Sequence, residues 1–166
     1  MNIYKVMLTL LLFVALATVS YGQTPESKSD TRIKQQLDEL GYKYSYTDEG
    51  NFKLVFRTKD DRTQIVFVYS KTNTYEGMEV REITSPLRIE QDRGAYGFND
   101  VYNILEKNQT YKIGAWQING GTSPFVLEFA IKLSAVAKKD MLGNLLQFAA
   151  KVADGVEAET STEDKY

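Results

Sequence analysis

The chemistry open to this 166-residue chain is limited first by the residues that it lacks. The sequence contains no histidine and no cysteine. Nucleophiles that depend on a histidine base are therefore excluded, as are metal sites built on histidine or thiolate ligands. A general base working near neutral pH would have to be a carboxylate or a lysine with a shifted pKa.

The acidic residues gather in three pairs, each in a segment whose composition favours a turn or loop. Paired carboxylates can drive glycoside hydrolysis or bind calcium. Turns are also ordinarily acidic and solvated, and none of the pairs has the spacing of a ligand set. We therefore expect no catalytic residue, no metal and no cofactor, and a protein that is not an enzyme. The pairs are Asp48–Glu49, Asp60–Asp61 and Glu90–Asp92.

One enzymatic reading stays open as the alternative. A carboxylate-dependent envelope hydrolase, or a carbohydrate-active protein, would need two acids that converge in one pocket. Glu128 with Asp140, or Glu90 with Asp92, are the candidate pairs.

The N-terminus has the pattern of a secretory signal peptide. Lys5 precedes an apolar run from Val6 to Ala17, and Ser20 and Gly22 are small residues placed for cleavage. The run is shorter than the roughly 20 residues that a membrane span needs. We expect cleavage after residue 22, an exported protein in the periplasm or outside the cell, and no stable membrane span. An uncleaved N-terminal anchor is the alternative.

Composition limits the kinds of partner and the cellular compartment that we expect for the protein. The net charge is −2 and the basic residues are scattered, whereas a nucleic-acid partner would need a basic face. We expect no nucleic-acid partner. An exported chain without cysteine must rely on packing rather than disulfides, which fits a bacterial envelope.

Hydrophobic periodicity predicts one α+β domain over residues 31–157, after a flexible lead at 23–30 and before a disordered acidic tail at 158–166. We expect an antiparallel sheet of about five strands with helices packed on one face, in the order helix, three strands, helix, two strands, helix. The clearest element is the strand from Phe125 to Leu133, with five alternating apolar residues, followed by an amphipathic helix to residue 157. A fourth early strand at 78–85 is weaker, and residues 86–97 have no regular pattern.

The expected outer face of the sheet is the candidate binding surface. If Ile65, Phe67 and Tyr69 face the core, their neighbours point outward. An antiparallel sheet solvated on one face would carry more polar residues there. We therefore expect this face to meet a protein, a peptide or a second copy of the chain; the alternative is that these are ordinary strand residues. The expected partner-binding residues are Val55, Val66, Val68, Val126 and Ala130.

Several segments together resemble a known family. Leu40–Tyr42 leads into the strands, Ile104–Asn108 ends a helix before Tyr111–Trp116, and a helix ending Val152–Gly155 follows the alternating strand. This arrangement, from Thr31 to Glu157, resembles YbjN-like domains, which share a fold with type III secretion chaperones.

The resemblance implies a non-enzymatic α+β domain of the order given above. It also implies binding of proteins or peptides, homodimers in some members, and a regulatory role in others. A cytoplasmic effector chaperone would not carry a signal peptide. Only the fold and the habit of binding proteins are therefore carried over to this chain.

Overall fold

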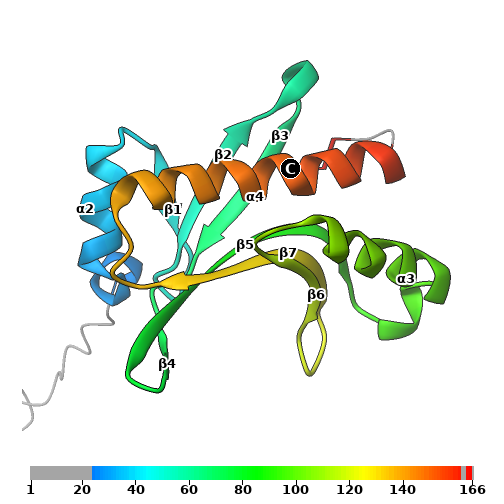
Figure 1. Ribbon diagram of the computed structural model, residues 1–166, viewed down its shortest axis with the longest axis horizontal. Coiled ribbons are helices and arrows are strands. Elements are labelled where there is room, and N and C mark those ends of the chain that lie inside the picture. The colour runs from blue at the N-terminus through cyan, green and yellow to red at the C-terminus, as the bar shows by residue number, and fades with distance from the viewer. Residues whose placement is uncertain (1–23, 162–163, 166) are drawn as a thin grey trace, which may run out of the picture.

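The protein is an α+β domain built on one antiparallel sheet, as the sequence predicts. The computed structural model describes residues 24–161, 164 and 165, and the expected signal peptide lies outside them. The long helix α4 and the short helix α2 lie side by side across one face of the sheet (Figure 1). Helix α3 lies at the end of the sheet next to β6 and faces the C-terminal end of α4. None of the helices within the described residues has the length and apolar character needed to cross a membrane.

The elements follow one another in the order helix, five strands, helix, two strands, helix, with short 3-10 turns between them. The helices are α2 (Thr31–Glu39), α3 (Phe98–Glu106) and α4 (Lys139–Thr160). The strands are β1 (Tyr44–Tyr46), β2 (Phe52–Arg57), β3 (Thr63–Val68), β4 (Asn73–Tyr75), β5 (Met78–Glu90), β6 (Ala115–Asn119) and β7 (Phe125–Ser134). The 3-10 turns are η1 (Pro25–Lys28), η2 (Lys59–Asp61), η3 (Arg93–Ala95) and η4 (Lys107–Thr110).

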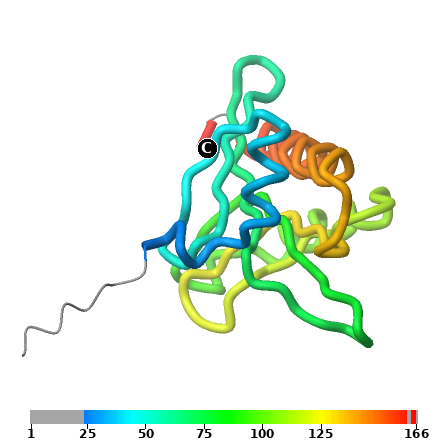
Figure 2. Tube along the Cα trace, turned by 90° about the vertical axis from the view of Figure 1, so that its left-hand side faces the viewer, coloured from blue at the N-terminus to red at the C-terminus, as the bar shows by residue number. Residues whose placement is uncertain are grey.

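The expected count of about five strands is wrong, because the sheet has seven. Its order is β1-β2-β3-β5-β7-β6, with β4 paired to β5 as an extra hairpin. Strand β4 is three exposed residues long and has no apolar alternation, so no periodic signal marks it. Figure 2 shows the β4–β5 turn (green) and the β2–β3 turn extending away from the body of the domain.

Strand β5 is the longest strand and continues through a proline. The register against β7 shifts between Pro86 and Arg88, which leaves Leu87 as the extra residue of a bulge. A proline cannot donate a ladder hydrogen bond, so within sheets it is found at edges and bulges. The segment after Pro86 was therefore expected to be irregular, although it pairs with β7 as far as Glu90.

The core lies between the sheet and α4. The alternation in β7 is confirmed, because Leu127, Phe129, Ile131 and Leu133 are all buried. Helix α4 packs on β3, β5 and β7 and contributes a buried stripe to the same core. The buried residues of that stripe include Leu142, Leu145, Leu146, Ala149, Ala153 and Val156.

Strand β3 faces the opposite way from the expectation. Leu54 pairs with Val66 and Phe52 with Val68, so both valines lie on the core side with β2's buried residues. Gln64 is buried beside them and donates hydrogen bonds from Nε2 to Ser85 Oγ at 3.1 Å and to the Pro86 carbonyl at 2.7 Å. The sequence pattern favoured the wrong face of β3 because the core-facing side includes polar Gln64, whereas Ile65, Phe67 and Tyr69 on the other side are all apolar or aromatic.

A buried cation joins the N-terminal segment to the sheet. The Arg81 side chain is buried and donates to the carbonyl oxygens of Tyr69 and Ser70 and to the Asp30 carboxylate. Asp30 caps α2 by accepting from the Arg32 backbone N–H at 2.8 Å. Burial raises the pKa of Asp30, but the hydrogen bonds from Arg32 and Arg81 outweigh it and bring the pKa well below the ordinary value.

Gly114 allows η4 to lead into β6 directly against the core. Its φ is +80°, and an added Cβ would lie 2.6 Å from Phe129 Cζ and 2.9 Å from Ile131 Cγ1. Gly77 has nearly the same φ, +81°, with no atom within 4 Å of its added Cβ. An alanine at Gly77 would therefore meet backbone strain alone, whereas an alanine at Gly114 would meet the same strain and a steric clash.

We expect Gly114→Ala to lower the free energy of unfolding by about 2–4 kcal/mol, because it adds overpacking against Phe129 to the positive-φ strain. Gly77→Ala should cost only the strain, about 1 kcal/mol. Urea unfolding followed by Trp116 fluorescence measures both. Equal losses in the two variants would show that β6 can move away from Phe129.

Candidate binding site

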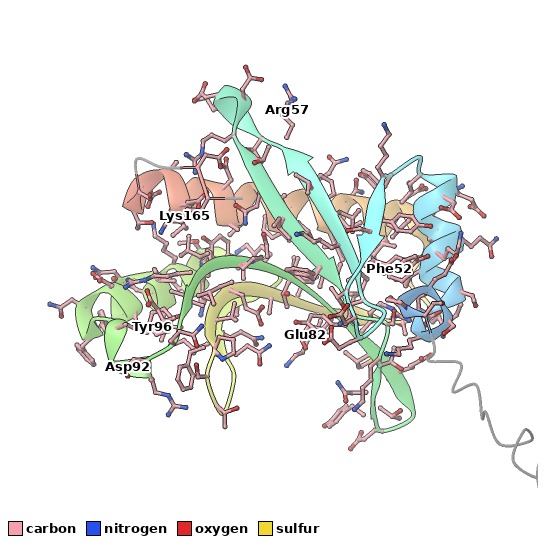
Figure 3. All side chains as sticks on the ribbon, turned by 180° about the vertical axis from the view of Figure 1, so that it is seen from behind. Phe52, Arg57, Glu82, Asp92, Tyr96 and Lys165 are labelled. Atoms are coloured by element: carbon pink, nitrogen blue, oxygen red, sulfur yellow. The ribbon has the colours of Figure 1, made fainter. Side chains whose placement is uncertain are left out.

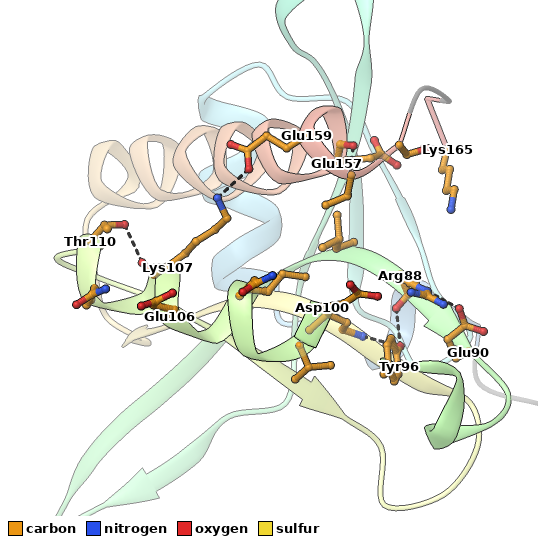
Figure 4. A pocket seen from close by; sticks show the side chains of 18 residues that line it. Arg88, Glu90, Tyr96, Asp100, Glu106, Lys107, Thr110, Glu157, Glu159 and Lys165 are labelled. Atoms are coloured by element: carbon orange, nitrogen blue, oxygen red, sulfur yellow. Dashed lines mark hydrogen bonds and ion pairs between the residues drawn. The ribbon is translucent and has the colours of Figure 1, made fainter. Parts of the chain in front are cut away.

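A cavity of about 940 Å³ opens between α3 and the C-terminal end of α4 (Figure 4). Its lining comes from β5, Tyr96, α3, η4, Leu127 of β7, the end of α4, and Ser161 and Lys165 after it. Segments about 70 residues apart in the sequence therefore meet around one space. Cavities of 300–1,000 Å³ with apolar walls and a few polar groups are the usual form of a ligand site.

The floor of the cavity is apolar and continuous with the core. It contains Leu87, Ile104 and Leu127, which are buried, and half-buried Val101. Leu87 is the bulge residue of β5, and Ile104 is the buried residue of α3. The bulge thus places an additional apolar side chain at the base of the cavity.

Tyr96 holds the wall of the cavity to the sheet. Its hydroxyl accepts from the Leu127 backbone N–H at 3.1 Å. It also lies 2.7 Å from the Phe125 carbonyl oxygen and 2.9 Å from that of Arg88, so it can donate to either. Burial raises the pKa of Tyr96, and the Leu127 N–H partly opposes the rise. One hydroxyl therefore bridges the ends of β5 and β7.

The charged lining is mostly acidic. Five carboxylates and three cationic side chains line the cavity. Arg88 Nε pairs with Glu90 at 2.5 Å, and Lys107 Nζ reaches across from η4 to Glu159 on α4 at 2.8 Å. Asp100 and Glu106 are exposed at the rim of the cavity, whereas Glu157 is buried on its inner side. The acidic residues of the lining are Glu90, Asp100, Glu106, Glu157 and Glu159, and the basic ones are Arg88, Lys107 and Lys165.

Glu157 is the most enclosed of these carboxylates, with 1 % of its side chain exposed. Its Oε2 accepts from Arg62 Nη2 at 2.6 Å, and Arg62 Nε donates to Asp154 at 2.7 Å. Burial raises the pKa of Glu157, and the Arg62 charge and a hydrogen bond from the Lys165 backbone N–H oppose the rise. Glu157 is thus a covered carboxylate that is bonded from two sides, beside the cavity rather than open to it.

The outer side of α3 carries an apolar stripe. Phe98, Tyr102 and Leu105 are spaced four and three residues apart, so they lie along one face of the helix. They are 82 %, 57 % and 42 % exposed, and the rings of Phe98 and Tyr102 stack with centroids 6.1 Å apart. The opposite face of α3 supplies Ile104 to the cavity. The helix is therefore apolar on both sides, although only one side is covered.

The structure does not bring the five expected partner-binding residues to one face. Val66 and Val68 are completely buried under α4, so the expectation of a shared outer face is wrong for them. Val55, Val126 and Ala130 do lie on the face that no helix covers. Val55 is 60 % exposed, Val126 is half-buried and Ala130 is buried by neighbouring strands. Figure 3 shows the sheet from this side, with β2 and β3 in front of α4.

The uncovered face carries a cluster of polar side chains at its middle. Gln117 Nε2 donates to Glu82 Oε1 and to Glu128 Oε1, both at 3.0 Å. Glu128 is 3 % exposed. Burial raises the pKa of Glu128; Gln117 and Thr84 lower it in part, and the charge of Glu82 raises it further. No group of three or more acidic residues in the described part of the chain is arranged to hold a metal ion.

Neither acid pair considered from the sequence converges. Glu128 points to the uncovered face, whereas Asp140 lies in the first turn of α4 on the covered side. Glu90 is paired with Arg88, and Asp92 accepts from the Gly94 backbone N–H at 2.8 Å as the cap of η3. These carboxylates have structural partners.

Sequence reasoning missed the cavity and the stripe on α3. The sequence pattern places Phe98, Val101, Ile104 and Leu105 on one side of a helix, and it does not show which of them are exposed. Their positions could have indicated an exposed stripe. A nine-residue helix with apolar residues on most of its circumference cannot bury all of them against one neighbour. The cavity itself has no signal in the sequence, because its walls join only in the folded chain.

The comparisons with known proteins show a similarity of fold. No family model matches the chain, and no curated protein matches it in sequence. The structure is similar to the crystal structure of YbjN from E. coli, described there as a proposed transcription regulator. The two chains are 9 % identical, the match covers 78 % of this chain and 90 % of that one, and the TM-score is 0.48. The resemblance read from the sequence pointed to the same group, and the proposals below rest on the residues of this chain.

We expect Tyr96→Phe to lower the free energy of unfolding by about 1–3 kcal/mol, because it leaves the buried Leu127 N–H without its acceptor. Tyr102→Phe removes the same atom from an exposed ring and should change stability by less than about 0.5 kcal/mol. Chemical denaturation monitored through Trp116 measures both. If the two variants are equally stable, the hydroxyl does not hold β5 to β7.

Glu128→Gln tests the polar cluster on the uncovered face. A carboxyl whose pKa is raised by folding stabilises the protein fully below its unfolded value, 4.5, and loses that contribution as the pH rises through the folded pKa. Each pH unit between the two values is worth about 1.4 kcal/mol. The variant should therefore gain stability over the wild type as the pH rises above about 4.5.

The measurement is the free energy of unfolding of both proteins between pH 4 and pH 8. Glu82, Tyr69, Thr84 and Gln117 surround the Glu128 carboxyl and stay in place in the variant. Glu26→Gln, at an exposed position, controls for the loss of one charge. A difference between Glu128→Gln and the wild type that is constant with pH would contradict the raised pKa.

Proposed function

We propose that this protein is an exported, non-enzymatic module that binds a protein or peptide through α3 and the cavity beneath it. The single observation that carries the proposal is the apolar stripe Phe98–Tyr102–Leu105 on a helix that also walls a large cavity. Exposed apolar side chains scattered singly are ordinary on a protein surface. Three on one helical face, two of them stacked aromatics, have the composition of an interface centre.

The uncovered sheet face supports a partner less well. Its middle is closed by the hydrogen-bonded cluster of Gln117 with Glu82 and Glu128. Its exposed apolar residues include Val55 on β2 and Ile89 on β5, which lie on strands that are not neighbours. A homodimer through this face, or through α3, is a separate outcome that light scattering distinguishes.

The open edge of β6 is also poorly suited to pairing with another strand. The Asn108 side chain accepts from the Trp116 N–H at 2.7 Å and donates to the Trp116 carbonyl at 3.4 Å. It thereby occupies one of the few outward-facing backbone positions of a five-residue edge strand. Partner binding by strand addition is therefore disfavoured, and side-chain contacts at α3 remain.

The test is photo-crosslinking in the producing cells, with a photoreactive residue placed singly at position 98, 102 or 55. The material analysed is the exported fraction, and its N-terminus should be Gln23. We expect discrete adducts from positions 98 and 102 and none from 55, which is comparably exposed on another face. Phe98→Ser should reduce the adducts at 102 by about tenfold or more, with folding unchanged.

Two results would count against the proposal. Adducts that form equally from all three positions would mean contact without a site. A protein that stays in the cytoplasm with residues 1–22 intact would contradict the proposed export. The adducts would then still test the site on α3.

A further inference from the structure

The sequence contains a single Asn-Gly pair, and the fold places it at the end of an edge strand. Asn119 is the last residue of β6 and is exposed, and Gly120 follows it with a φ of +107°. In such a pair the glycine has no side chain to shield its backbone nitrogen from the neighbouring amide. The pair therefore combines an amide carbon with an accessible nitrogen, in a place that solvent reaches.

The pairing of β6 with β7 leaves the Gly120 nitrogen outside the ladder. Trp116 directs its backbone N–H and carbonyl to the Asn108 side chain, away from β7. Hydrogen-bonded and non-hydrogen-bonded positions alternate along antiparallel strands. Asn119, at the opposite parity to Trp116, therefore exchanges its backbone bonds with Val126. The Gly120 N–H lies on the other side of the same trans peptide from the Asn119 carbonyl, so it points away from β7.

The side chain of Asn119 belongs to the polar cluster at the middle of the uncovered face. Burial raises the pKa of Glu128, and hydrogen bonds from Gln117 and Asn119 are among those that lower it in part. Glu82 brings a second acid close to Glu128, because Gln117 Nε2 lies 3.0 Å from an oxygen of each glutamate. The amide of Asn119 is thus one of the neutral donors that make this pair of acids tolerable.

We propose that Asn119 is a site of spontaneous deamidation, and that the product disturbs the polar cluster on the uncovered face. The Gly120 nitrogen attacks the side-chain carbon of Asn119, a C–N bond forms, and ammonia leaves with the proton of the attacking N–H. Water then adds to either carbonyl carbon of the succinimide ring. The ring opens to aspartate, or to isoaspartate, in which the main chain runs through the side-chain carbon. The net change replaces one ammonia by one water.

The reaction needs only a local opening of the sheet. Asn119 and Val126 form the last pair of the β6–β7 ladder before the turn at 120–124. The end of a ladder opens at a far lower cost in free energy than a core strand. The hydrogen bond to Glu128 holds the amide in place while the pair is closed. Opening of this one pair therefore controls the rate.

Either product changes the cluster. Aspartate at position 119 cannot donate to Glu128 and adds a negative charge beside Glu128 and Glu82. The other titratable groups of this face near them are Tyr69, after β3, and Lys132, which lies opposite Glu82. Isoaspartate also lengthens the main chain between β6 and the turn, which weakens the register with β7.

The first test incubates the purified protein at pH 6 and at pH 8 and follows each asparagine by peptide mass spectrometry. Asn73 and Asn99 are exposed, are not followed by glycine, and serve as internal controls. We expect position 119 to convert at least about tenfold faster than either control, which corresponds to a barrier lower by ~1.4 kcal/mol. Conversion should be faster at pH 8, because the attacking nitrogen must lose its proton, and it should yield aspartate and isoaspartate together.

Two results of this test would overturn the proposal. Conversion at position 119 that is no faster than at Asn73 and Asn99 would remove the site. Aspartate without isoaspartate would mean direct hydrolysis of the amide and would remove the attack by Gly120.

The second test measures what the product does to the cluster. Asn119→Asp should raise the unfolding equilibrium constant by about fivefold to tenfold near pH 7, because a donor is lost and a like charge is gained. The effect should shrink below pH 4.5, where Glu128 is protonated. Asn73→Asp, an added charge at an exposed position of β4, should change the constant by less than about twofold.

A double variant assigns the effect to Glu128. Asn119→Asp made in the Glu128→Gln background should cost clearly less than in the wild type, because the charge that it opposes is gone. An equal cost in both backgrounds would show that position 119 does not act on Glu128 and would overturn the second half of the proposal. Neither test involves α3, so the outcome is independent of the proposed function.

Discussion

The pairing of β5 with β7 is the constraint on which the rest of the structure depends. The register runs from Val80 opposite Ser134 to Glu90 opposite Phe125, interrupted only at the bulge. Strand β5 also pairs with β3 and β4, so both halves of the sheet are joined through it. Its core-facing residues meet α4, and its bulge sets the base of the cavity. An element with neighbours on both sides and a helix above it has little freedom to move.

Two arginine side chains, buried Arg81 and partly buried Arg62, hold other elements to the sheet. Arg81 joins β5 to the cap of α2, and Arg62 joins the β2–β3 turn to the last turns of α4. Each guanidinium meets several acceptors, which offsets the cost of removing its charge from water. At Arg62 the guanidinium bonds both Asp154 and Glu157, so it fixes the C-terminal turns of α4 to the sheet.

The cavity exists because α3 stands away from α4. Lys107 and Glu159 bridge the two at one point, and Tyr96 anchors the segment before α3 to the sheet (Figure 4). Between these two attachments the described residues leave a cavity above Leu87 and Leu127. Helix α3 is therefore held at its ends, with apolar residues on its inner and outer sides. Because α3 is held only at its ends, both of its sides can contact a partner, although the helix is only nine residues long.

The sequence by itself determined the α+β class, the helices on one face and the buried face of β7, because the period of apolar residues reports directly on which side of an element is covered. It misplaced β3, where buried Gln64 interrupts the pattern, and it ended β5 at Pro86, where a bulge lets the strand continue. Only the tertiary structure decided that Phe98 and Tyr102 are exposed and that a cavity lies between α3 and the end of α4, because both depend on how far α3 stands from α4, and no local pattern encodes the distance between two elements.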